Sequence, residues 1–499
     1  MATLKEYRDI RIEKLNKLIK LGVNPYPAES HRTNTTLEIT DKFTDLEDKD
    51  VVVAGRLVSI RSHSKLCFMD LKDASGKIQL YIKEENFSTP DYKNSEVGFN
   101  DLNLLDNGDF VEANGKVTKT KTGQISVEVK SIRLLTKSLR PLPDQWTGFK
   151  DKETRLRKRY IDTNINEDVY KRFIRRAKFW EAHREFFKEH GFLEMNIPVL
   201  ESTPGGADAN PFVTHMDALD QDFYLRISQE LYLKRLIGGG YERVYEVGPR
   251  FRNEGLSDEH LPEHMAMEFY WAYAGFKQGI QLVTDLIRYV ADKVYGTQQF
   301  KMRGFDIDLS KEWEVLDYTK LLKDKHGIDV FKTTLEDVKS AIQKSGGEMP
   351  KKLTLERAID HLWKETRKSI EGPAVVIGEP KFVSPLAKAD PENPNLTLRF
   401  HPIIAGSELG NGFAELNDPI DQLDRFKKQQ EMRDKGDQEA QFMDTDFVEM
   451  LEYGMPPTFG YGHSERVFWF MEDVTAREGV PFTQLRTEDD TLNKEIFGL

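Results

Sequence analysis

Apolar and polar residues alternate in five short runs over residues 51–135, and turn residues separate the runs. The runs read VVVAGRLVSI, LCFMDLKD, GKIQLYI, DFVEANGKVTK and GQISVEVKSIRLL. A period of two is typical of strands with one buried face, and Gly, Asn and Asp between the runs favour tight turns. Five such strands within about a hundred residues predict a small closed β-barrel of the OB type over residues 49–140.

A helical pattern precedes this barrel. Ile10, Leu15 and Leu18 recur near the spacing of one helix face over residues 7–21, and a glycine and a proline then stop the pattern. Residues 1–48 are therefore expected to form one amphipathic helix and a lead-in to the barrel.

The pattern of apolar and polar residues changes again after the barrel. Two prolines open residues 141–165, which are expected to be a linker. An apolar stripe then predicts a helix over residues 169–190, and a strand is expected to follow directly at residues 192–200. Pro198 lies in this strand and indicates an edge or an interface, because proline cannot donate to a sheet.

Strand-like and helical runs are interleaved over the rest of the chain. The strand-like runs are DFYLRIS, ERVYEVG, AMEFYWAYA, AVVIGEP, LTLRFHPII and NGFAELN, and helical patterns occur near residues 278–295 and 355–370. This mixture predicts an α+β domain over residues 166–499, in which helices flank an antiparallel sheet.

Two of these runs carry a polar face where a core face would be expected. In the first, alternation places Met267, Phe269, Trp271 and Tyr273 on one side and Glu268, Tyr270 and Ala272 on the other. In the second, one side carries Asn411, Phe413, Glu415 and Asn417. An exposed strand would not place an aromatic ring between an amide and a carboxylate, so a ligand-facing wall is predicted.

Charge is distributed unevenly along the chain. The sequence has 72 Lys and Arg against 84 Asp and Glu, a net charge of −12, yet residues 1–150 carry 24 basic and 22 acidic residues. Residues 116–140 have seven basic residues and one acid, Glu128. This run is compatible either with a nucleic-acid face or with a lysine-protected sheet edge. Phe68 and Gln79 favour RNA, since an aromatic ring and an amide could stack a base and bond its edge.

Several classes of protein are excluded by what the sequence lacks. The chain contains no GxxxxGK[ST], GxGxxG after a strand, HExxH, CxxC pair or GxSxG motif. No apolar run has the length of a membrane span, and residues 1–20 do not read as a secretion signal. With Cys67 as its single cysteine, the chain is expected to be cytoplasmic.

Specific motifs resemble those of class II aminoacyl-tRNA synthetases. RFRNE followed by a loop and MEFY resembles motif 2, and the strand that contains Pro198 resembles motif 1. The segments PGGADANPF, YLRISQELYLKRL, VSPLAK, SELGNGFAELNDPIDQ, YGMPPT and LLTKSLRPLPD resemble the lysyl members of the Asp/Asn/Lys subclass. The resemblance implies ATP-dependent activation of L-lysine to lysyl-adenylate and transfer to tRNA(Lys), by a homodimer built through motif 1.

The resemblance also implies roles for individual residues. Catalysis is expected of Arg252 and Arg466, and ATP binding of Arg252, Glu254, His260, His264, Glu408 and Arg466. The expected lysine pocket consists of Gly206, Glu230, Glu268, Tyr270, Asn411, Phe413 and Glu415. The expected anticodon contacts are Arg61, Phe68 and Gln79.

Three departures from the family pattern accompany these roles. Mg²⁺ is expected on Glu408, but the usual acidic companion seven residues earlier is His401. His264 stands where the family usually has a phenylalanine, and an imidazole can still stack on adenine. The third motif, GYGHSER, is shifted relative to the family's run of alternating glycines.

Alternative functions remain open at this point. An aspartate or asparagine enzyme of the same subclass would need a different pocket, which Glu230 and Glu415 disfavour. A paralogue that lysylates a protein would resemble the catalytic domain alone, and the barrel disfavours it. A catalytically impaired RNA-binding protein is compatible with His401 and the altered third motif. How arginine would be excluded is not visible in the sequence.

Overall fold

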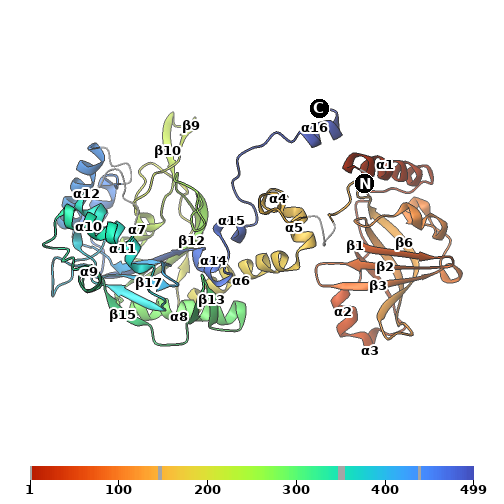
Figure 1. Ribbon diagram of the computed structural model, residues 1–499, viewed down its shortest axis with the longest axis horizontal. Helices are drawn as coiled ribbons and strands as arrows, with labels where there is room; N and C mark the ends of the chain where they lie inside the picture. The colour runs from red at the N-terminus through yellow and green to blue at the C-terminus, as the bar shows by residue number, and fades with distance from the viewer. Residues whose placement is uncertain (1–2, 144–148, 347–353, 436–439) are drawn as a thin grey trace. The chain divides into compact units, whose positions relative to one another are not determined.

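The computed structural model describes residues 3–143, 149–346, 354–435 and 440–499. The chain divides into two compact units (Figure 1). Unit 1 contains residues 1–165 and 485–499, and unit 2 contains residues 166–484. Of the predicted linker, residues 144–148 lie outside the described residues.

Unit 1 is built around a closed barrel. Its strands pair in the order β3-β2-β1-β5-β6, and β3 pairs with β6 to close the ring. The strands are β1 (Asp50–His63), β2 (Leu66–Lys72), β3 (Lys77–Lys83), β5 (Phe110–Lys119) and β6 (Ile125–Thr136), with the short β4 (Glu96–Val97) beside β6. Alternate side chains of these strands fill the interior. The predicted five-stranded OB-type barrel is therefore confirmed.

Unit 1 also contains a set of helices. They are α1 (Leu4–Lys20), α2 (Thr36–Asp41), α3 (Phe43–Leu46), η1 (Glu84–Asn86), η2 (Tyr92–Asn94), η3 (Phe99–Leu104), α4 (Lys152–Arg157), α5 (Arg159–Ile165) and α16 (Thr491–Phe497). The first helix matches the predicted amphipathic helix. Thr3 and Glu6 form a capping box at its start, which satisfies two backbone N–H groups of the first turn.

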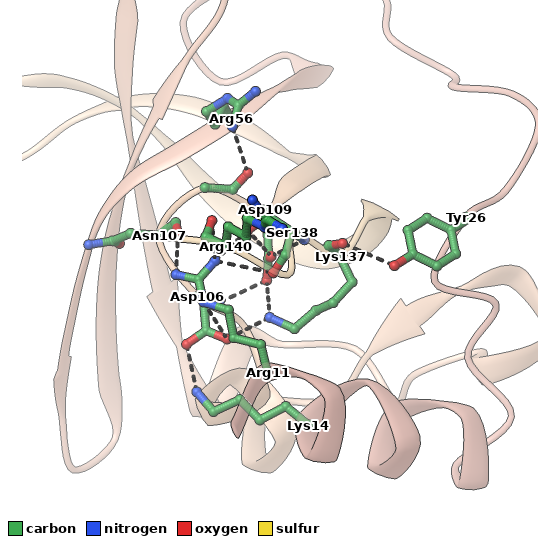
Figure 2. Close-up of polar contacts among 11 residues, drawn as sticks. Arg11, Lys14, Tyr26, Arg56, Asp106, Asn107, Asp109, Lys137, Ser138 and Arg140 are labelled. Atoms are coloured by element: carbon green, nitrogen blue, oxygen red, sulfur yellow. Dashed lines mark hydrogen bonds and ion pairs between the residues drawn. The ribbon is translucent and has the colours of Figure 1, made fainter. Parts of the chain in front are cut away.

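A buried polar cluster fastens α1 to the end of β6 (Figure 2). The Arg11 guanidinium donates to the carbonyl of Ser138 at 3.1 Å and to that of Asn107 at 2.9 Å. Lys137 is fully buried, and its Nζ lies 2.6 Å from Asp106 and 2.8 Å from Asp109. The buried Lys137 ammonium is therefore balanced by carboxylates, as a buried ion needs.

Unit 2 is organised by a large mixed sheet. Its main path runs β15-β16-β17-β19-β20-β12-β11-β7, and β18 pairs with β17. These strands are β7 (Leu193–Glu194), β11 (Arg243–Phe251), β12 (Glu263–Ala272), β15 (Glu314–Asp317), β16 (Ala374–Ile377), β17 (Arg399–Ile404), β18 (Ser407–Glu408), β19 (Asn411–Ala414) and β20 (Thr458–Ser464). Pairing is antiparallel except for the parallel outer pairs β15–β16 and β11–β7. The predicted α+β fold is confirmed, with these parallel edges added.

Two smaller sheets and a set of helices complete unit 2. The sheets consist of β8 (Leu200–Glu201), β9 (Val213–Met216) and β10 (Gln221–Leu225), and of β13 (Gln299–Met302) and β14 (Phe305–Asp308). The helices are α6 (Glu167–Glu189), α7 (Glu230–Gly238), α8 (Phe276–Tyr295), α9 (Tyr318–His326), α10 (Leu335–Lys344), α11 (Leu355–Arg367), η4 (Lys381–Val383), α12 (Pro419–Asp434), α13 (Thr445–Tyr453), α14 (Arg466–Met471) and α15 (Ala476–Gly479). Among the described residues, no helix is both long and apolar enough to cross a bilayer.

The helices cover the large sheet with separate apolar clusters. Side chains of α6 and α8 pack with Met267 and Phe269 of β12. Side chains of α7 and α13 pack with Tyr270 and Phe413 in another cluster. The alternation in β12 therefore sends its hydrophobic residues to the α8 side and leaves Glu268 for the other face.

Three details of the predicted strands differ from the structure. The expected strand at residues 192–200 reduces to the two-residue pieces β7 and β8, because Pro198 lies between them and cannot donate to a ladder. Tyr273 was assigned to a core face, but β12 has ended, and the residue is 68% exposed with a φ of 65°. Asn417 leaves the predicted wall and donates to the carbonyl of Met455 at 3.0 Å.

Candidate active site

Two adjoining cavities lie in unit 2 against the polar face of the large sheet. The first has a volume of about 260 Å³ and the second of about 180 Å³. Arg250, Arg252 and Gly462 line both of them. A ligand in one cavity would therefore lie next to a ligand in the other, with two guanidinium groups at the boundary.

The first cavity gathers residues that are distant in the sequence. The predicted residues among its lining are Gly206, Glu230, Glu268, Tyr270, Asn411, Phe413, Glu415 and Arg252. Strands β12 and β19 supply four of them, and the first turn of α7 supplies Glu230. The structure thus brings together the whole set that the sequence assigned to a lysine pocket.

Glu268 is held rigidly by its neighbours. Its Oε1 accepts from the Ser228 hydroxyl at 2.7 Å and from the Arg250 guanidinium, and its Oε2 accepts from the Tyr270 hydroxyl at 3.0 Å. Burial, together with the nearby carboxylates of Glu268 and Glu230, raises the pKa of the Tyr270 phenol well above its ordinary value. Tyr270 is therefore a permanent hydrogen-bond donor here.

Behind one end of the first cavity lies a cation that was not predicted from the sequence. Lys234 is completely buried, and its Nζ lies 2.5 Å from Oε1 of Glu230 and in contact with Oε2 of Glu415. Burial opposes a charged amine, but these carboxylates keep the pKa of Lys234 above its ordinary value. The spacing of four residues between Glu230 and Lys234 on a helix was the available signal.

Glu415 has one oxygen left over in this arrangement. Its Oε1 is buried and has no hydrogen-bond partner among the described residues. Gly460 lies directly beside this oxygen and the Tyr270 ring, and any Cβ there would collide with both. The end of the cavity therefore presents an unpaired carboxylate oxygen to a ligand.

The second cavity is lined by three arginines, Arg250, Arg252 and Arg466, and by three glutamates. Its lining contains all the predicted ATP-binding residues, namely Arg252, Glu254, His260, His264, Glu408 and Arg466. Burial and the neighbouring Arg250 lower the pKa of Arg252 to about 10. Burial and both arginines lower the pKa of His264 to about 3, so its imidazole is neutral. Clustered guanidinium groups of this kind favour an anion.

Glu259, a second residue that the sequence did not reveal, lines this second cavity. Its Oε2 accepts from the Ser407 hydroxyl at 3.0 Å and lies 3.6 Å from a guanidinium nitrogen of Arg466. Arg466 also donates to the backbone carbonyl of Glu408. A carboxylate thus occupies a position next to Arg466 that an anionic ligand could take.

His401 is buried behind the second cavity, next to Glu408. Its Nε2 lies 3.2 Å from a carboxylate oxygen of Glu379, and its Nδ1 lies 3.2 Å from the carbonyl of Gly410 and 4.0 Å from Glu408. Both ring nitrogens therefore face acceptors and act as donors. Burial would lower the pKa of His401, but Glu408 and Glu379 raise it above its ordinary value.

A buried histidine pair lies below the boundary between the cavities. His183 of α6 and His463 of β20 are joined by their Nε2 atoms at 2.9 Å. His183 donates through Nδ1 to the carbonyl of Phe179 at 2.7 Å, so its Nε2 must accept from His463. Burial lowers the pKa of His183 to about 4 and that of His463 well below its ordinary value. Both rings are neutral.

The barrel of unit 1 carries the other predicted site. Arg61, Phe68 and Gln79 come from β1, β2 and β3, and Phe68 pairs with Tyr81 across the strands. The Phe68 and Tyr81 rings are stacked, with centroids 5.1 Å apart. Tyr81 was missed, although it shares the face of Gln79 two residues before it. These side chains form an aromatic and polar platform.

The basic run at residues 116–140 is partly structural. Lys137 is fully buried in the cluster of Figure 2, and Arg133 is buried beside Glu112. Lys130 pairs with Asp50 at 2.5 Å. Three of these seven basic residues therefore have acidic partners within unit 1.

Comparison with known proteins adds independent findings. Residues 151–485 match the family described as tRNA synthetases class II (D, K and N), and residues 51–135 match the OB-fold nucleic acid binding domain. The lysine–tRNA ligase of Fervidobacterium nodosum is 40% identical over 494 residues, which cover 98% of this chain and 95% of that protein. The lysine–tRNA ligase of Carboxydothermus hydrogenoformans is 41% identical over 492 residues, covering 97% and 99%. That of Thermosipho africanus is 39% identical over 503 residues, covering 99% of each.

Proposed function

Because the chain belongs to the class II tRNA synthetases of the Asp, Lys and Asn group, and within them to the lysine–tRNA ligases, we propose that it joins L-lysine to tRNA(Lys) at the expense of ATP. It is an aminoacyl-tRNA synthetase. The observation that carries the lysine assignment is the unpaired, buried Oε1 of Glu415 at the end of a cavity that adjoins an arginine-lined one.

The first cavity takes the amino acid in this proposal. Glu415 and Glu230 bind the ε-ammonium group, and Glu268 faces the α-amino group with Gly206 beside it. Asn411, Phe413 and Tyr270 form the walls along the aliphatic chain. A charge-assisted hydrogen bond contributes about 1.5 to 3 kcal/mol. A neutral side chain would leave the carboxylate oxygen of Glu415 unpaired, which disfavours leucine and asparagine, and the carboxylate of aspartate would be repelled by Glu230 and Glu415.

The second cavity takes ATP. Glu254 and His260 hold the nucleotide, the neutral His264 ring stacks on adenine, and Arg466 binds the γ-phosphate after displacing Glu259. Arg252 lies between the cavities, where it contacts both the lysine carboxylate and the α-phosphate. The chain needs no nucleophilic side chain, because the substrate carboxylate itself attacks.

The reaction follows from this placement. A lysine carboxylate oxygen attacks the α-phosphorus of ATP, a P–O bond forms, and the bond to pyrophosphate breaks. Arg252 neutralises negative charge as it builds on the transferring group, and rigid positioning lowers the entropic part of the barrier. In the second step a terminal ribose hydroxyl of tRNA attacks the carbonyl carbon, forming the ester and releasing AMP.

The residues near Glu408 decide how Mg²⁺ would bind. His401 donates through both ring nitrogens and has no lone pair to offer, and Mg²⁺ prefers oxygen ligands. The donors fit an ion held by Glu408 together with nucleotide phosphates, and they do not fit an ion shared between Glu408 and His401. Bound in this way, Mg²⁺ would neutralise charge on the departing pyrophosphate.

Unit 1 recognises the anticodon of tRNA(Lys) in this proposal. Phe68, supported by the stacked Tyr81 ring, offers a face to a base, and Gln79 and Arg61 offer hydrogen bonds to base edges. The enzyme acts in the cytoplasm as a homodimer through α6 and the residues that follow it. Exposed apolar side chains there, including Ile174, Leu193 and Leu200, support this interface.

Amino-acid-dependent exchange of ³²P between pyrophosphate and ATP, with no tRNA present, tests the proposal. Exchange is expected with lysine and not with aspartate or asparagine. The variant Arg252→Gln is expected to lower kcat by about 10²- to 10³-fold. Exchange with no amino acid would overturn the proposal in favour of an RNA-binding protein without adenylating activity, and exchange with aspartate or asparagine would reassign the substrate.

A further inference from the structure

Lys234 places a fixed ammonium group at the end of the first cavity. Its Nζ bridges Glu230 and Glu415, and it lies 5.1 Å from the centre of the Phe413 ring and 5.9 Å from that of Tyr270. All four neighbours line the cavity, whereas Lys234 itself lies behind them. The wall that would meet a substrate side chain is therefore backed by a cation of the protein.

The charges at this end leave room for one more cation. Two carboxyl groups face one ammonium group, and burial raises the pKa of Glu230 and raises that of Glu415 well above its ordinary value. When both groups are ionised, they carry one negative charge more than Lys234 balances. Lys234 forms ion pairs with Oε1 of Glu230 and Oε2 of Glu415, while Oε1 of Glu415 has neither an ion pair nor a hydrogen bond among the described residues. A single ammonium group would make the buried cluster neutral, as buried charges require.

We propose that Lys234 is the positioning residue that sets the length and charge of the side chain accepted by the pocket, and that it thereby separates lysine from arginine. The inference rests on the proposed lysine-activating function. The Lys234 ammonium closes the pocket beyond the carboxylates of Glu230 and Glu415. It also fixes the position of the free Oε1 of Glu415, which can then accept a hydrogen bond from one ammonium group of the substrate.

Arginine has the same net charge as lysine, so charge alone does not exclude it. Its guanidinium is longer and wider, and it pairs best with two oxygens at once. Lys234 already occupies one oxygen of Glu230 and one of Glu415. A guanidinium would need two free oxygens side by side, and the Lys234 ammonium leaves space and a free oxygen for a single ammonium group only.

The decisive variant is Lys234→Met, which keeps a side chain of similar length and removes the charge. In the exchange assay, the KM for lysine is expected to rise about 10- to 100-fold, with a smaller change in kcat and no change in the KM for ATP. The ratio of kcat/KM for lysine to that for arginine is expected to fall at least tenfold, because a guanidinium can now pair with both carboxylates.

Lys137→Met is the matched control. Lys137 is also a fully buried lysine between two carboxylates, Asp106 and Asp109, but it lies in unit 1. Its replacement is expected to leave the KM for lysine and the lysine-to-arginine ratio unchanged. A general effect of losing a buried ammonium group would therefore appear in both variants, and an effect on recognition only in Lys234→Met.

A second variant covers the case in which Lys234→Met does not fold. Lys234→Ala leaves a space that propylammonium matches, and this ion is expected to restore both folding and discrimination, whereas propanol is not. The inference is overturned if a folded Lys234→Met keeps its KM and its discrimination, or if propylammonium restores neither property. Failure of the wild-type protein to activate lysine would instead reject the proposed function itself.

Discussion

At the scale of single residues, His401 shows how one side chain decides whether the acids around it need a metal ion. A carboxylate at this position would stand against Glu379 and Glu408 and would need a metal ion to hold the three together. The imidazole pairs with these acids instead. Arg399 and His401 together overcome burial and lower the pKa of Glu379 to about 2, so the acid beside the ring is ionised.

We predict that His401→Asp makes stability dependent on Mg²⁺. Breaking a buried charge pair costs about 3 to 5 kcal/mol. The free energy of unfolding without Mg²⁺ should fall by an amount of this order, measured by urea denaturation. Added Mg²⁺ should recover much of the loss in His401→Asp and little in His401→Asn, which brings no carboxylate. Equal stability of His401→Asp and the wild type without Mg²⁺ would contradict this account.

The same scale shows what sequence reading can and cannot find. The alternation of β12 placed Glu268 and Tyr270 on the side of the cavity, since side-chain direction in a strand depends only on parity. Lys234 was not found, because its importance arises from Glu415, which is far away in the sequence and reaches it only through the packing of α7 against the large sheet. Glu259 was missed for a similar reason, since its partners Ser407 and Arg466 come from other segments.

At the scale of elements, the contact between α6 and β20 depends on a neutral histidine pair. The proton between the two rings belongs to His463, and His183 accepts it. Protonating His183 would place two donors face to face inside the apolar cluster of α6 and β20. The packing of these two elements is therefore sensitive to acid.

The pH dependence of stability follows from the pKa of His183. An unfolded histidine titrates near 6.5, whereas His183 stays neutral to about pH 4. Between these values the unfolded chain binds a proton that the folded chain does not, so stability falls as the pH falls through this window. The loss amounts to about 3 kcal/mol. Below pH 4 this contribution no longer changes.

The variant His183→Gln tests this dependence, because its side-chain oxygen can still accept from His463. The free energy of unfolding, measured at several pH values from 7 to 4, should fall less steeply in the variant than in the wild type. Parallel curves for the two proteins would show that the pair does not titrate as described.

The boundaries of helices and strands show where the local hydrophobic pattern is no longer enough to predict the structure. The barrel and the helices α6, α8 and α11 follow from periodicity, since each has several buried residues at the expected spacing. Helix α1 buries only Arg11 and Leu18, and Ile10 of its predicted apolar face is 49% exposed. The strand expected at residues 192–200 breaks at Pro198, whose neighbours pair separately as β7 and β8. Closure of the barrel by the β3–β6 pair is a tertiary feature that parity alone does not encode.

At the scale of the whole molecule, the chain enters unit 1 twice. Residues 485–499 leave unit 2 and add α16 to unit 1. Glu495 of this segment lies 3.6 Å from Lys5, and the Phe497 ring lies under the guanidinium groups of Arg8 and Arg140, at 6.0 and 5.3 Å. The aromatic ring thus joins the first helix and the end of the barrel.

Docking of α16 can be tested through Ile496, which is only 7% exposed. Ile496→Ala removes apolar surface whose burial stabilises the docked helix by about 2 kcal/mol. Hydrogen exchange of the α16 amides should accelerate by about 10- to 30-fold. Leu499→Ala is the control, since Leu499 is 88% exposed, and it should leave the exchange rates unchanged. Equal rates in both variants would mean that Ile496 does not hold the helix.

The return of α16 has a consequence for the order in which the protein is made. A ribosome synthesises about 5 to 20 residues per second, so the residues between the two parts of unit 1 take roughly 15 to 60 seconds. During that time the barrel can close, but the docking site for Phe497 beside Arg8 and Arg140 stays empty. The domain that begins to fold first is therefore completed last, after the whole of unit 2 has left the ribosome.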